Sequence, residues 1–396
     1  MKKIILVVLL GGILAGLAVN KLISQPAIDS SSLASSLNEF NFDFYRNISQ
    51  PNTNMISSPY SLSSLLALSA MGAGGDTRSA LMHALHLTNL YGVSEALDKI
   101  NDSWLSTGTA SFANALWGAK KLTYNESFLM AMRQSKYNHF FTLDYAKNPE
   151  IARQAINTWV EKNTQNVIKD LIPVNFLTND TRLVLVNAIY FKGLWQWPFD
   201  SSLTKPGPFT LMNGTTINVP MMHLQQHFVY SENDSLRMLQ LPYEKEKLMM
   251  AILLPKNSLL EVQKKLKGPL FVDLLSQARR EDVILSMPKF KVESTFDSLK
   301  ETLQGMGLAT VFDKKADFSH MVKEPIWFSE AVQKAVIEVD EKGTVAAAAS
   351  GMVGVTAVAP SEPPKPIEFV VDRPFIFVIF DVQSNIILFM GQVVNF

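Results

Sequence analysis

The sequence predicts an α+β fold, in which helices and strands are both abundant but do not alternate regularly. Helix signals dominate the first half of the chain and strand signals the second half, whereas a doubly wound α/β sheet would interleave them. No internal repeat and no long linker divides residues 37–396, so we expect one domain there. Hydrophobic residues make up 47% of the 396 residues, which is enough apolar surface for a large core.

The clearest helix signal is Ser58 followed by Pro59, an N-cap residue type with proline at the first helical position. Leucines and alanines then recur at helical spacing until Gly72. Because apolar residues surround this helix on nearly all sides, we expect it to be buried. A second helix is predicted for Pro149–Lys169, with its apolar residues on one stripe.

Strand signals are strongest after residue 180. Leu183–Phe191 is a continuous apolar run broken by Asn187, which is typical of a strand covered on both faces. Further strand signals are Val283–Lys291, Lys334–Val339, Phe375–Phe380 and Ile386–Met390. The last two flank a short polar turn and therefore predict a C-terminal hairpin.

The first 24 residues are predicted to be a targeting segment. Lys2 and Lys3 precede an uncharged run from Ile4 to Val19, as in a secretory signal peptide. No clean cleavage site follows, so an uncleaved membrane anchor stays open as the second choice. Residues 25–36 are rich in serine and are predicted to be a linker. We therefore expect a secreted or periplasmic protein.

Composition and motifs exclude several functional classes. The chain has no cysteine, which rules out disulfides, thiol nucleophiles and cysteine-bound metals. Its 36 basic and 36 acidic residues balance, which argues against nucleic acid as a partner. His223 and His227 lack a third metal ligand nearby, and no catalytic or nucleotide-binding motif is present. We expect no metal, no cofactor and no enzymatic activity.

A segment of small residues from Gly343 to Ala359 breaks the pattern of the rest of the chain. It carries no charge and no proline, and a cluster of prolines begins at Pro360. One interpretation is a low-complexity linker. The other is a loop that can become a strand, because small side chains fit between existing strands and every N–H stays available for ladder bonds. Alternation would then place Thr344, Ala346, Ala348, Ser350, Met352, Gly354 and Thr356 on one uncharged face.

Eight short motifs follow one another along the chain: Asn54–Ser61, Leu185–Trp195, Leu241–Tyr243, Met287–Phe290, Ala316–Ser319, Glu341–Thr344, Asp372–Phe375 and Phe389–Gly391. Together they resemble the serpin family over nearly all of residues 37–396. Each motif alone is weak, but their shared order and spacing are specific. The resemblance implies three β-sheets, eight or nine helices and an exposed reactive-centre loop.

The resemblance also implies a suicide inhibitor of serine proteases. In this family a protease cuts the loop and forms an acyl-enzyme, and the freed arm then inserts into the central sheet. The implied hinge residues are Glu341, Gly343, Thr344, Ala346, Ala347, Ala348 and Ala349. Counting along the loop from Glu341, as in the family, puts the reactive bond at Ala357-Val358. Small residues there suit elastase- or subtilisin-like proteases.

Two further groups of residues match sites that control opening of the family's central sheet. Trp195 and Lys289 match the "breach" at the top of the sheet, where Lys289 is expected to pair with Glu341. Ser58, Ser61, Asn187 and Gln333 match the "shutter" near its centre. Gln333 stands where many serpins have a histidine; glutamine can still bond Asn187 or Ser58 but cannot titrate.

Other expectations concern partners and an alternative function. Asn89–Thr107 has Lys99 as its one basic residue, so no heparin-binding site is evident. We expect a monomer, at risk of polymerising by insertion of one molecule's loop into another's sheet. The alternative function is a non-inhibitory serpin acting as chaperone, carrier or storage protein. Such members often carry proline or bulky charged residues in the hinge, which this chain lacks.

Overall fold

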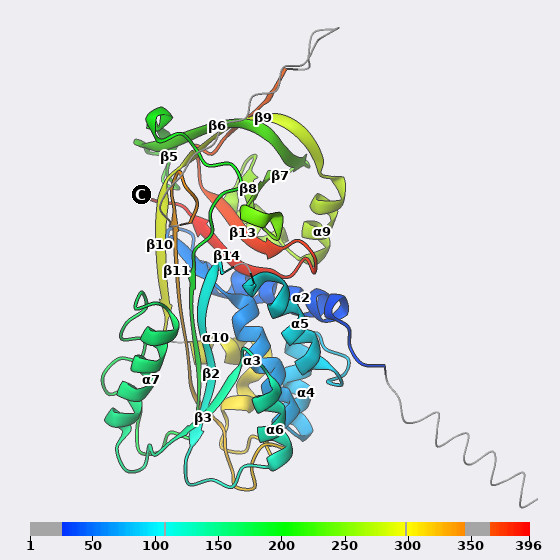
Figure 1. Cartoon of the computed structure of the whole chain (residues 1–396), viewed down its shortest axis with the longest axis vertical. Helices are drawn as coiled ribbons and strands as arrows, with labels where there is room; N and C mark the ends of the chain where they lie inside the picture. The colour runs from blue at the N-terminus through cyan, green and yellow to red at the C-terminus, as the bar shows by residue number, and fades with distance from the viewer. Residues whose placement is uncertain (1–25, 107, 298, 345–364) are drawn as a thin grey trace, which may run out of the picture.

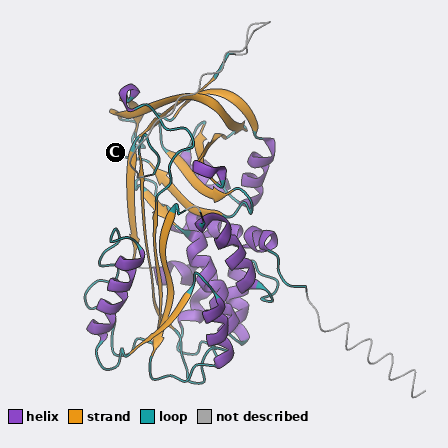
Figure 2. Cartoon of the chain, in the orientation of Figure 1, coloured by secondary structure: helices purple, strands orange, loops and turns teal. Residues whose placement is uncertain are grey.

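The structure is a computed structural model that describes residues 26–106, 108–297, 299–344 and 365–396. It confirms the α+β class and, within these residues, has nine α-helices. The helices are α2 (Ser30–Ile48), α3 (Pro59–Gly72), α4 (Gly75–Ala84), α5 (Val93–Leu105), α6 (Glu126–Gln134), α7 (Pro149–Asn163), α8 (Leu259–Lys265), α9 (Gly268–Gln277) and α10 (Leu299–Leu303). Most of them gather on one side of a long sheet, and α7 lies on its other side (Figure 2).

The long sheet has five strands in the order β10-β11-β4-β2-β3. Their bounds are β10 (Phe290–Phe296), β11 (Phe328–Val339), β4 (Leu183–Phe191), β2 (Ala110–Ala119) and β3 (His139–Leu143). The central neighbours β4 and β11 run parallel, with antiparallel strands outside them at β2 and β10. All residues of β4 are buried, which confirms the prediction of a strand covered on both faces.

A second sheet of nine strands packs above the first (Figure 1). Its strands are β1 (Met55–Ser57), β5 (Lys205–Thr210), β6 (Thr216–Glu232), β7 (Leu236–Pro242), β8 (Leu248–Pro255), β9 (Arg279–Pro288), β12 (Ile367–Val370), β13 (Phe375–Asp381) and β14 (Ile387–Val393). The described residues therefore form two sheets where three were expected, because two of the expected sheets are joined into one. The reason is the long strand β6, which pairs with β9 along most of its length and with β7 at its end.

The N-terminal helix corrects one prediction. Residues 25–36 were expected to form a linker, but α2 begins at Ser30 and buries Leu33 and Ala34. Asp29 caps the helix, since its Oδ1 accepts a hydrogen bond from the Ser32 N–H at 2.7 Å. The serine-rich run is therefore the first turn of an amphipathic helix. The predicted targeting segment, residues 1–24, lies outside the described residues, and no helix within them is both long and apolar enough to cross a membrane.

The buried helix α3 is confirmed, but its start differs from the prediction. Pro59 is the first helical residue, as expected, yet the side chain of Ser58 makes no capping hydrogen bond. Its hydroxyl instead donates to the carbonyl oxygen of Leu388 on the C-terminal hairpin, at 2.8 Å. The hairpin itself is confirmed as the antiparallel pair β13 and β14. Ser58 thus anchors the start of α3 to this hairpin.

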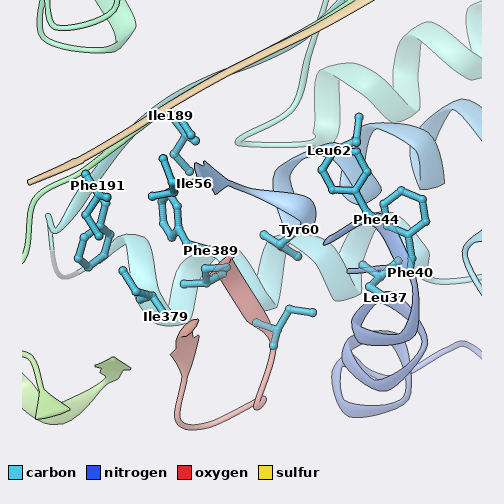
Figure 3. Close-up of a cluster of buried hydrophobic side chains, with 14 of the residues drawn as sticks. Leu37, Phe40, Phe44, Ile56, Tyr60, Leu62, Ile189, Phe191, Ile379 and Phe389 are labelled. Atoms are coloured by element: carbon cyan, nitrogen blue, oxygen red, sulfur yellow. The ribbon is translucent and has the colours of Figure 1, made fainter. Parts of the chain in front are cut away.

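The main core fills the space between the long sheet, helices α2 and α3, and the C-terminal hairpin. Figure 3 shows Phe40 and Phe44 of α2 beside Leu62 of α3, and Phe389 of the hairpin on the other side of Tyr60, near Phe191. A separate cluster lies on the opposite face of the sheet under α7, where Ile156 and Val160 pack. Helix α7 was predicted to reach Lys169, but it ends at Asn163 because Gln165 and Asn166 adopt positive φ angles.

Candidate functional site

The candidate site runs along the seam between β4 and β11, from the centre of the long sheet to its upper end. The two strands pair in parallel register from Phe328 opposite Leu183 to Val336 opposite Tyr190. Parallel pairs form slightly weaker ladders than antiparallel ones. At the upper end, the chain leaves β11 at Val339 and enters the predicted hinge, which begins at Glu341.

Trp195 holds this upper end together. Its ring stacks on Tyr243 with centroids 4.6 Å apart, and the side chain is 4% exposed. The indole N–H donates to the carbonyl oxygen of Asp340 at 3.0 Å, and the backbone N–H donates to that of Lys342, also at 3.0 Å. The predicted breach tryptophan therefore binds the hinge through both its side chain and its backbone.

The predicted ion pair between Lys289 and Glu341 is present, with Nζ and Oε2 2.8 Å apart. The hydroxyl of Thr204 donates to the other carboxylate oxygen of Glu341 at 2.8 Å. Burial alone would raise the pKa of Glu341, but the hydrogen bonds from Lys289 and Thr204 outweigh it and lower the pKa below its usual value. Since Lys289 is 39% exposed, the pair contributes about 1 kcal/mol or less to stability.

Gly343 follows in a conformation that a side chain would not tolerate. Its φ is +149°, and an added Cβ would collide with the carbonyl oxygen of Gly193 and lie 2.6 Å from Cα of Leu194. The backbone passes close to the chain just beyond the end of β4, because Gly343 forms an antiparallel bridge with Leu194. Glycine at this position is therefore required by the close approach of the two chains.

Thr344 already sits inside the upper end of the seam. Its side chain is fully buried, and its N–H donates to the carbonyl oxygen of Gly193 at 2.5 Å. Its hydroxyl lies 3.2 Å from that of Tyr243. The remaining predicted hinge residues Ala346–Ala349 and the predicted reactive bond Ala357-Val358 lie outside the described residues.

The four predicted shutter residues lie together at the middle of the seam, and all are buried. Gln333 on β11 faces Asn187 on β4, and its Nε2 donates to Asn187 Oδ1 at 2.7 Å and to the Ser58 carbonyl at 2.9 Å. Its Oε1 accepts from the Ser58 N–H at 3.2 Å. Asn187 in turn donates to the hydroxyl of Ser61 at 2.5 Å. Glutamine thus makes both of the contacts that the sequence suggested for it.

Two further asparagines, missed by the sequence analysis, extend this network across the sheet. Asn187 Nδ2 also donates to Asn114 Oδ1 on β2 at 2.8 Å, and Asn114 donates to Asn138 Oδ1 at 2.6 Å. The amides of Gln333, Asn187, Asn114 and Asn138 therefore form one chain in which every donor points the same way. A signal for Asn114 was present, because it interrupts an apolar strand sequence as Asn187 does.

The described residues offer no metal site. No group of three or more His, Asp or Glu side chains among them is placed to hold a metal ion. His223 lies on β6, where its Nδ1 is 2.8 Å from the hydroxyl of Ser286. His227 lies four residues further along the same strand, so the two do not share a ligand position.

Comparison with known proteins identifies this architecture. Residues 35–396 match the family model Serpin, described as serpin (serine protease inhibitor). A protein of Methanosarcina mazei, described as an uncharacterized serpin-like protein, is 34% identical over 94% of this chain and 89% of its own length. The leukocyte elastase inhibitor of Bos taurus is 35% identical over 91% of this chain and 98% of its own.

A solved structure gives the same result. The crystal structure of native protease nexin-1 with heparin matches with a TM-score of 0.83 and 28% identity, covering 93% of this chain and all of the other. The family match spans both the seam and its upper end. The chain therefore belongs to the serpin family of serine protease inhibitors.

Proposed function

We propose that this protein is a suicide inhibitor of serine proteases that works by inserting its cleaved reactive loop between β4 and β11. The observation that supports this most directly is the position of Thr344, buried at the upper end of that seam and bonded to Gly193. A strand that continues from Thr344 into the seam runs opposite to both of its neighbours. Insertion therefore replaces one parallel pairing by two antiparallel ones.

The bridge between Gly343 and Leu194 sets a register for the inserted strand. If each further residue pairs with the preceding residue of β4, Ala346 meets Phe191, Ala348 meets Ile189 and Ser350 meets Asn187. Directly opposite residues point to the same face of a sheet. Small alanines would therefore lie beside the large Phe191 and Ile189, which face the main core. The hydroxyl of Ser350 would enter the amide network of the shutter.

Insertion carries a cost and a larger gain. The cost is loss of the β4–β11 ladder and of the Gln333–Asn187 hydrogen bond, because a strand now separates the two residues. The gain is a ladder on both sides of the new strand. At about 1 kcal/mol for each net hydrogen bond, an inserted segment from Thr344 to Ala357 releases on the order of 10 kcal/mol. This is comparable to the stability of a whole domain.

The protease carries out the cleavage reaction, and this chain stops it before the ester intermediate is hydrolysed. The protease serine attacks the carbonyl carbon of Ala357, its oxygen forms an ester there, and the Ala357-Val358 bond breaks with release of the Val358 amine. Insertion of the arm then drags the esterified protease along the sheet. Distortion of its active site stalls hydrolysis of the ester. The small residues at this bond lead us to propose elastase- or subtilisin-like targets.

We also propose that the protein acts outside the cytoplasm, as a secreted or periplasmic monomer, with attachment through residues 1–24 as the second choice. This rests on the basic start and apolar run of that segment. We propose that the protein does not depend on heparin, because helix α5 (Val93–Leu105) carries Lys99 as its one basic residue, and that it uses no cofactor.

The experiment is to mix the protein with pancreatic elastase or subtilisin and analyse the products on a denaturing gel. The proposal expects a covalent complex whose mass is the sum of the protease and the cleaved inhibitor. Cleavage of the loop across a panel of serine proteases, without any such complex, would instead favour a non-inhibitory serpin. Mass spectrometry of the released peptide identifies the reactive bond.

A further inference from the structure

An open groove of about 810 Å³ lies at the free edge of the long sheet. It is bordered by edge strand β3, by the end of β2 and by helix α6. Gly118 at this end of β2 pairs with Leu183 at the start of β4, whereas the hinge meets Gly193 just beyond the end of β4. The groove is therefore separate from the hinge, and none of the proposed inhibitory residues lines it.

The walls of the groove are mostly apolar. Leu129 and Met132 come from α6, and Phe140 and Phe141 come from β3, so both faces of the edge strand contribute. A volume of this size falls within the usual range of small-molecule sites, roughly 300–1,000 Å³. Apolar surface at such an opening is costly to leave in water unless something covers it.

One buried polar group at the groove lacks a partner. Trp117 lines the groove with its side chain 5% exposed, and its indole N–H is buried with no hydrogen-bond acceptor in the part of the chain that the structure describes. Its ring packs against Phe141 with centroids 4.5 Å apart and against Trp159 at 5.5 Å. A buried N–H without an acceptor is unfavourable. Trp117 points to the same face of the sheet as Phe141, and Phe140 points to the other, so Trp117 marks the side of the groove that lies under α7.

The charged groups at the groove favour an anion. Lys120 lines it and makes no ion pair with any described residue, while Arg133 pairs with Glu126 at 2.7 Å. His139 stacks on Phe141, and burial lowers the pKa of its imidazole, so it is a neutral donor or acceptor at neutral pH. The rim thus combines one unpaired cation with an apolar interior.

We propose that this groove binds a single-chain amphipathic carboxylate, such as a medium- or long-chain fatty acid. The carboxylate pairs with Lys120, and the alkyl chain lies against Leu129, Met132 and Phe140. The proposal commits to this class because the groove places an apolar wall, formed by Leu129, Met132 and Phe140, beside one unpaired cation, Lys120.

The test uses dodecanoate below its micelle concentration, with binding followed by calorimetry and by intrinsic tryptophan fluorescence. Dodecanol and dodecylammonium have the same chain without the negative charge, and both should bind at least tenfold more weakly. Lys120→Glu should weaken dodecanoate binding at least tenfold. Its matched control, Lys121→Glu, changes an adjacent exposed lysine that does not line the groove and should change binding less than threefold.

A second variant fills the groove. Thr142 lines it and is exposed, so Thr142→Trp should abolish binding while leaving the melting temperature close to that of the parent. Thr216→Trp, on an exposed site of β6, is the control that should bind normally. The proposal is overturned by absence of saturable binding, by equal effects of Lys120→Glu and Lys121→Glu, or by equally tight binding of dodecylammonium. None of these readouts requires protease inhibition.

Discussion

Gln333 and Asn187 face each other across the two central parallel strands, and the side-chain amide of one donates to that of the other at 2.7 Å. This hydrogen bond joins the two strands that must separate before a third can lie between them. It is also one link in the amide chain that continues to Asn114 and Asn138. The closed state of the sheet is therefore held at its centre by buried side chains as well as by the backbone ladder.

Gln333→Leu should destabilise the intact protein by about 3 kcal/mol. The substitution leaves the Ser58 N–H and Asn187 Oδ1 buried without their partners, and each such group costs about 1–3 kcal/mol. The measurement is the first guanidinium unfolding transition of the intact protein. Gln134→Leu, an exposed position at the end of α6, is the control and should change stability by less than about 0.5 kcal/mol. Equal effects of the two substitutions would show that the network does not hold the sheet closed.

Ser350→Ala should affect the cleaved protein alone. In the register that we propose, Ser350 replaces the lost Gln333–Asn187 contact, so its hydroxyl matters only after insertion. Removing it should cost about 1 kcal/mol in the loop-cleaved form, measured by its melting temperature, and leave the intact form unchanged. Ser361→Ala, beyond the reactive bond, is the control and should change neither form. A loss of the same size in intact and cleaved Ser350→Ala protein would contradict the register.

A charge at position 344 should convert the inhibitor into a substrate. The side chain of Thr344 is fully buried, so Thr344→Arg places a charge in a closed apolar site. Ala348→Pro should act in the same way, because proline removes a ladder donor. The measurement is the number of inhibitor molecules consumed for each protease molecule trapped, which should rise at least tenfold.

The matched control for Thr344→Arg is Val345→Glu. The next residue along a strand points to the opposite face, so this charge is expected to stay away from the core. Val345→Glu should therefore keep its inhibitory activity. If both charged variants inhibit as well as the parent, insertion past the hinge cannot be the mechanism.

The sequence could predict most of the elements that form the site, but not all of its contacts. Asn187 was visible because a polar residue interrupts an apolar strand, and Gly343 because the small-residue segment begins there. The pairing of Lys289 with Glu341 and of Gln333 with Asn187 came from the family resemblance, since local patterns do not report contacts between distant strands. The structure confirms both contacts.

The predictions that were wrong or missing share one physical cause, which is that contacts between distant parts of the chain decide the outcome and local sequence patterns do not show them. Ser58 has the side chain of an N-cap, but the tertiary contact with Leu388 competes for its hydroxyl. The serine-rich start of α2 resembles a linker by composition, and only the burial of Leu33 and Leu37 makes it a helix. Asn138 lies outside any strand, so no periodicity marks it as the end of the amide chain.

The hinge contact of Glu341 should weaken in acid. The pKa of Glu341 is lowered in the folded state, so its contribution is complete above the unfolded value near 4.5 and is lost as pH falls through the folded pKa. The difference in stability between the parent and Glu341→Gln should therefore be largest at neutral pH, at about 1 kcal/mol or less, and disappear at low pH. Guanidinium unfolding at pH 7 and at pH 3 measures it. A difference that grows in acid would contradict the assigned sign.

The central claim is that the intact fold stores free energy that cleavage of the loop releases. The most direct measurement compares guanidinium unfolding of the intact protein with that of protein clipped in its reactive loop. We expect the clipped form to resist a much higher denaturant concentration, in line with a gain on the order of 10 kcal/mol from the added ladder. If the two forms unfold at the same concentration, no strand has been inserted and the proposed mechanism is wrong.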